Sequence, residues 1–143
     1  MKDRIDQPMR LLRWLLIIPA AVVAWYAAII LALVMHAGLD ILCPAEQMIS
    51  SLCVAPWYEA ASNAVVCVGA GLAALLIMLA CTSLAPAYKK QVAVATFVAG
   101  AAVAALMGWN VGAFAPMLAA MVTGALALWV LTRRLARRER VLS

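Results

Sequence analysis

The sequence predicts an all-α integral membrane protein, a bundle of four transmembrane helices with its N-terminus and C-terminus both in the cytoplasm. Three observations carry this prediction. The 143-residue chain is 69% apolar and only 12% charged, its apolar residues form long continuous runs, and its lysines and arginines lie only beside those runs. A soluble domain of this size could not bury so much apolar surface, whereas lipid tails accept it.

The continuous runs also decide between the two backbones that can cross a bilayer. Every backbone N–H and C=O must be paired inside the protein there, which leaves helices or a closed barrel. Barrel strands alternate apolar and polar side chains, and these runs do not, so they are helices. The net charge of +5 would suggest a nucleic-acid partner for a soluble protein. Because the basic residues flank apolar runs, we expect no nucleic acid and a lipid bilayer instead.

The first helix is predicted at 14–35, an uncharged run that would span about 33 Å. Pro19 would fall in its first turn or two, where proline costs a helix least. A cleaved secretory signal is the alternative, but the run is longer than a signal core. The segment 36–59 carries three acidic residues among prolines and a glycine and is predicted to be an extramembrane loop.

Three further helices complete the single predicted transmembrane domain, 1–143. The second is expected at about 62–84, before Pro86 and two lysines. The next uncharged stretch is too long for one span and about right for two. Its turn residues lie at 108–112, which predicts helices three and four at about 92–107 and 115–131, with Pro116 in the first turn of the last.

Charge decides the predicted orientation. Four spans place the N-terminus, the Lys89–Lys90 loop and the C-terminus on one side, and every lysine and arginine lies there. The opposite loops carry only Asp40, Glu46 and Glu59. The excess of positive charge in cytoplasmic loops therefore predicts a multi-pass protein of the bacterial cytoplasmic (inner) membrane, with the 36–59 loop in the periplasm.

Two of the four cysteines, Cys43 and Cys53, lie in that loop. The periplasm is oxidising, so we predict a structural disulfide worth about 2–3 kcal/mol around a short helical turn that begins at Pro44. A thiol redox pair is the alternative, although the usual Cys-x-x-Cys spacing is missing. Cys67 and Cys81 fall within the second span, where they act as small apolar residues.

The loop also holds a candidate polar cluster. His36, the only histidine, precedes Asp40 by four residues, which places both on one helical face, and Glu59 could join them. The alternative is that His36 and Asp40 face water at a helix end and form no cluster. A metal site needs three or four ligands of matched geometry, so no metal and no cofactor are predicted.

Small and basic residues suggest how the helices meet each other and the lipid. Stripes at helical spacing predict close helix packing in the second and fourth helices; they comprise Ser62, Gly69, Ala73 and Ala80, and Ala113, Ala120, Gly124 and Ala127. The basic tail is predicted to rest on anionic lipid at about 1 kcal/mol per charge, with an acidic protein partner as the alternative; its arginines are Arg133, Arg134, Arg137, Arg138 and Arg140.

What the spans lack bears on function. No Asp, Glu, Lys, Arg or His lies inside a predicted span, which argues against a gradient-coupled carrier. A haem held between two histidines is excluded, because the chain has only one histidine. No phosphate-binding loop, zinc-protease motif or nucleophile elbow is present. We therefore expect a small non-enzymatic membrane protein, a structural, accessory or assembly subunit of a membrane complex or a homo-oligomer. The alternatives are a small transporter or channel subunit and a periplasmic-face thiol redox protein.

Overall fold

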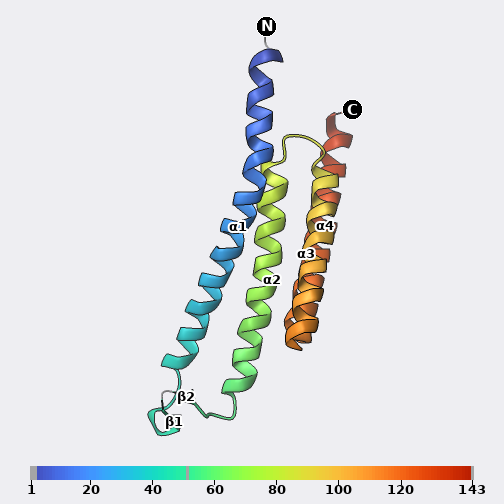
Figure 1. Cartoon of the computed structure of the whole chain (residues 1–143). Coiled ribbons are helices and arrows are strands. Elements are labelled where there is room, and N and C mark those ends of the chain that lie inside the picture. The colour runs from blue at the N-terminus through green and yellow to red at the C-terminus, as the bar shows by residue number, and fades with distance from the viewer. Residues whose placement is uncertain (1–2, 51, 143) are drawn as a thin grey trace.

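The computed structural model describes the backbone of residues 3–50 and 52–142 and the side chains of 12–50 and 52–137. Four helices dominate the described chain (Figure 1): α1 Asp3–Ile41, α2 Tyr58–Leu84, α3 Lys89–Val111 and α4 Phe114–Leu142. All four are long and apolar enough to cross a membrane. The predicted all-helical architecture with four such helices is confirmed.

The helices form a three-helix core with a fourth helix outside it. The central helix, α2, packs against α1 on one side and against α3 and α4 on the other, and α3 and α4 form an antiparallel pair (Figure 1). Buried Met78, Ala93 and Ala127, one from each of α2, α3 and α4, form the centre of the core. From α1, the described side chains contribute only Ala28 to the buried apolar set. The outer helix therefore depends on a single main neighbour.

The two ends of the bundle differ in chemistry. Both termini and the α2–α3 connection lie at one end (Figure 1), which we call the basic end because Lys89, Lys90 and the α4 arginines lie there. The opposite end carries the only strands of the described chain, β1 Met48–Ile49 and β2 Leu52–Cys53, preceded by a 3-10 turn over Ala45–Gln47. We call it the hairpin end.

Every predicted helix is shorter than the observed one. The predicted loop 36–59 is too wide, because α1 continues to Ile41 and α2 already begins at Tyr58. The length of an apolar run matches the thickness of the bilayer core. The helix itself can continue beyond that run, because its backbone hydrogen bonds do not require apolar side chains. Polar residues such as His36 and Asp40 are tolerated in the helix beyond the run.

The predicted place of Pro19 and the predicted turn at 108–112 are also corrected. Pro19 lies well inside α1 instead of near its start, since α1 begins at Asp3. A proline there removes one backbone hydrogen bond, and the ribbon of α1 changes direction in its N-terminal half (Figure 1). The turn predicted at 108–112 shrinks to two residues, because α3 runs to Val111. Gly112, with a φ of 71°, ends it in the left-handed conformation that favours glycine.

Candidate functional site

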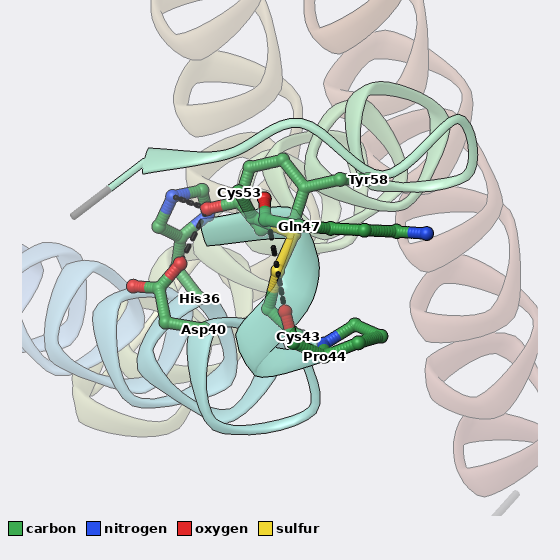
Figure 2. The surroundings of a disulfide bond; sticks show 7 residues. All are labelled: His36, Asp40, Cys43, Pro44, Gln47, Cys53 and Tyr58. Carbon is green, nitrogen blue, oxygen red and sulfur yellow. Dashed lines mark hydrogen bonds between the residues drawn. A yellow bond between two sulfur atoms is a disulfide. The ribbon is translucent and has the colours of Figure 1, made fainter. Parts of the chain in front are cut away.

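The hairpin end brings together the polar residues that the sequence singles out. Cys43 follows α1 and Cys53 ends β2, and their sulfur atoms are joined with a Cα–Cα distance of 6.0 Å. The expected pairing is therefore present. Figure 2 shows this bond beside the residues that link the end of α1 to the start of α2.

The segment that the disulfide encloses is not the single helical turn predicted for it. Pro44 is followed by a 3-10 turn of three residues, after which the chain forms an antiparallel hairpin. Met48 pairs with Cys53 and Ile49 with Leu52. Ser50, at the tip, has a φ of 50°, which turns the backbone sharply enough for β2 to return along β1.

Tyr58, which was predicted only to lie in the loop 36–59, completes the polar cluster. Its hydroxyl donates a hydrogen bond to Asp40 Oδ1 at 2.5 Å and lies 3.4 Å from His36 Nε2 (Figure 2). The His36 and Tyr58 rings meet edge to face with centroids 6.1 Å apart. His36 and Asp40 do share one face of α1, as their spacing requires. The predicted third member, Glu59, is exposed and has no such bond among the described residues.

The cluster joins two helices, and its chemistry is that of a tether. One hydroxyl from α2 bridges two side chains of α1, next to the covalent link between Cys43 and Cys53. Within the described chain, no three His, Cys, Asp or Glu side chains converge as metal ligands do. The arrangement offers one imidazole and one carboxylate, which suit hydrogen bonding more than metal binding.

Small residues set the approach of α1 to α2. A Cβ atom added to Gly69 would lie 2.8 Å from the Cβ of Ala32, closer than real carbon atoms pack, so any larger residue there requires α1 and α2 to move apart. A groove of about 400 Å³ runs beside this contact, and Gly69, Ala73, Ala32 and His36 are among the residues that line it. Gly69 and Ala73 thus belong to the interface between α1 and α2, which we call the α1–α2 seam.

The other small residues lie elsewhere in the bundle. Gly124 faces α3, because an added Cβ would lie 3.1 Å from Phe97 Cδ2 and 4.0 Å from the Ala74 Cβ. Ser62 and Ala120 are half-buried. One close contact of α2 with α4 was not predicted: a Cβ on Gly71 would lie 2.9 Å from the Thr123 hydroxyl oxygen. The only sequence signal for it is a glycine in a helix interior, where glycine is otherwise unfavourable.

The basic end presents exposed cations. Arg133, Arg134 and Arg137 are exposed, and the Arg133 guanidinium lies 3.9 Å from the centroid of the Trp129 ring, a cation–π contact. The side chains of Arg138 and Arg140 lie outside the described part, although helix α4 continues past them. Beside the arginines, a hollow of about 470 Å³ is lined by Tyr88 from the α2–α3 connection, by Lys89 and Lys90 at the start of α3 and by Leu135 from α4.

Comparisons with protein-family models, with curated proteins and with solved structures find no significant match to this chain.

Proposed function

We propose that this chain is a multi-pass protein of the bacterial cytoplasmic membrane, with both termini in the cytoplasm and the hairpin end in the periplasm, and that it works as a non-enzymatic subunit of a membrane assembly. The orientation follows from charge, because the lysines and arginines gather at the basic end and the acidic residues Asp40, Glu46 and Glu59 at the other. Its partner is a second copy or another membrane protein.

The observation that carries the subunit proposal is a contrast between two outward faces. The outer stripe of α1 is bulky, with Leu15, Ile18, Tyr26 and Leu33 each more than half exposed. Side chains of this size suit lipid tails, which fill the spaces between them. We take this face to be the lipid-facing one.

The outward face of α3 contains a stripe of small residues, which ends at exposed Leu106 and lies between exposed Val98 and Val103. Ala95, Ala99 and Ala102 are all exposed and follow the i, i+4, i+7 spacing that places them on one face. Small residues on an outward helix face let a second helix approach closely, so that backbones and side chains make van der Waals contact along their length. The proposal therefore assigns the α3 face to helix–helix association.

An association assay tests this proposal. Ala99→Leu adds bulk at the centre of the α3 stripe and should convert the assembled protein to a monomer in native-like lipid nanodiscs. The matched control is Ala27→Leu, which makes the same change at an exposed position of α1 and should leave the assembly intact. Mass photometry and in-membrane cross-linking at low protein-to-lipid ratio give the stoichiometry.

A wild-type chain that is monomeric and captures no partner from its own membrane would contradict the subunit proposal and favour the transporter or channel alternative. Reporter fusions test the orientation separately. Fusions at Ser143 and at the Lys89–Lys90 connection should behave as cytoplasmic, and a fusion near Gln47 as periplasmic. An exported Ser143 fusion would contradict both the orientation and the four-span topology.

A further inference from the structure

The connection between α1 and α2 exposes more large apolar side chains than a loop surrounded by water would. Ile41 is 84% exposed, Leu42 70%, Leu52 69% and Ile49 60%. Leu42, Ile49 and Leu52 lie between α1 and α2, and Ile41 is the last residue of α1. Grouped exposed apolar residues of this kind mark surfaces that bind something.

The hairpin concentrates this apolar character on one face. Residues directly opposite each other in an antiparallel pair point to the same side, so Ile49 and Leu52 share one face and Met48 and Cys53 share the other. The second face carries the disulfide to Cys43. The disulfide thus lies on the face away from Ile49 and Leu52, and both of these side chains are exposed.

The hairpin cannot move far from the helix ends. Chain length allows little freedom, because α1 ends at Ile41 and α2 begins at Tyr58, and the Cys43–Cys53 bond closes most of the residues between them. The hydrogen bond from Tyr58 to Asp40 holds the two helix ends together at the same level (Figure 2). Trp57, which immediately precedes α2, is a residue typical of the boundary between lipid and water.

We propose that the face formed by Ile49 and Leu52 docks on the lipid surface of the outer leaflet. This inference rests on the proposed membrane insertion of the helices, which puts the hairpin at headgroup level. The contact is apolar and not electrostatic, because 36–59 contains no lysine or arginine and carries three acidic residues. Zwitterionic lipid is the matching partner, and the side chains enter to about 5–10 Å, as amphipathic interfacial segments do.

Depth-dependent quenching tests the docking. The protein is placed in zwitterionic nanodiscs whose lipids carry bromine near the top of the acyl chains, and the emission added by Leu52→Trp is compared with that added by Met48→Trp. Both substitutions are on the same hairpin, but on opposite faces. Leu52→Trp should lose at least about half of its added emission, given an insertion depth of about 5–10 Å, and should resist aqueous iodide. Met48→Trp should show the reverse order.

The outcomes separate this inference from the membrane proposal. The five native tryptophans report insertion of the helices, so an unquenched wild type would contradict the membrane proposal itself. If the wild type is quenched but the Leu52→Trp emission is quenched only by iodide, the lipid-docking inference is overturned. Protection from iodide that grows with the protein-to-lipid ratio, without bromine quenching, would assign the face to a second copy and also overturn it. Alkylation before and after reduction checks that each variant keeps its disulfide.

Discussion

Gly69 and Gly71 stand two residues apart on α2, yet they serve different parts of the molecule. Gly69 faces Ala32 of α1, and Gly71 faces Thr123 of α4. Two residues rotate the helix surface by about 200°, so the glycines lie on nearly opposite faces. One allows the outer helix to approach, and the other allows the core to close.

The two contacts differ in what else supports them. On the core side, α2 also meets Phe97, Ala93 and Ala127 through Met78 and Leu75. On the outer side, α1 is held by the glycine seam, by the Tyr58 hydroxyl and by the Cys43–Cys53 bond. Strain at the core contact must therefore spread through three helices, whereas strain at the seam can be relieved by displacing one helix.

The largest effect is expected from Gly71→Leu. Thr123 cannot easily give way, since its hydroxyl already donates a hydrogen bond to the Ala119 carbonyl at 2.8 Å. A leucine would push α4 away from α2 and should lower the free energy of unfolding by about 3 kcal/mol, the upper end of the usual overpacking cost. Unfolding in mixed micelles, followed by circular dichroism, measures the loss.

The control for this variant is Ala64→Leu, the same kind of enlargement at an exposed position of α2. It should change the free energy of unfolding by less than about 0.5 kcal/mol, as surface substitutions usually do. Equal losses in the two variants would mean that Gly71 is not a close-contact position and that the core is packed differently.

How far the sequence predicts this arrangement depends on the kind of information. The existence of four helices follows from apolar runs, and the Cys43–Cys53 pairing follows from their shared loop. The rotation of each helix does not follow, because a helix that is apolar all round gives no periodicity to show which face meets which neighbour. The stripe of small residues predicted that Gly69 and Ala73 lie at a close helix contact, but not which helix they meet. Gly71 is off that stripe, so its contact with Thr123 was not predicted.

The polar cluster shows the same limit at finer scale. The four-residue spacing of His36 and Asp40 predicts that they share a helical face, because that geometry is local. Their partner comes from another helix, and choosing between Tyr58 and Glu59 requires the position of the α2 start. The sequence analysis began α2 at residue 62 and left both residues in a loop, so it had no means to favour the hydroxyl over the carboxylate.

A second prediction concerns the covalent link at the hairpin end. Cys53→Ser removes the bond that closes ten residues and should cost about 2 kcal/mol, mainly in the stability of the α1–α2 connection. The rate of amide hydrogen exchange should rise in the segment that connects α1 to α2, while the rates in α3 and α4 stay unchanged.

The matched control is Cys67→Ser, which changes a free cysteine of α2 in the same way. In the native protein, Cys43 and Cys53 should resist alkylation until they are reduced. Exchange that increases equally throughout the four helices would show that the outer helix and the core unfold together, which would remove the distinction drawn between them.

The smallest expected change in the free energy of unfolding is at the α1–α2 seam. It is best measured as the coupling energy between substitutions at Gly69 and Ala32. Gly69→Ala places a methyl group 2.8 Å from the Ala32 Cβ, so α1 must shift outward. The cost of that shift, about 1 kcal/mol, is partly offset because alanine favours a helix over glycine by a similar amount. The single variant alone therefore says little, and its partner Ala32→Gly is needed to remove the colliding atom.

In the double variant the two residues exchange places across the seam, so the contact is restored with the methyl group on the other helix. The coupling between the two changes should be favourable by at least about 0.5 kcal/mol, the lower limit seen for residues in contact. Repeating the cycle in the Cys53→Ser background sharpens the test, since only the seam and the Tyr58 hydroxyl then hold α1 and the coupling should be larger. A cycle that is additive within error in both backgrounds would mean that α1 does not rest on α2 at Gly69.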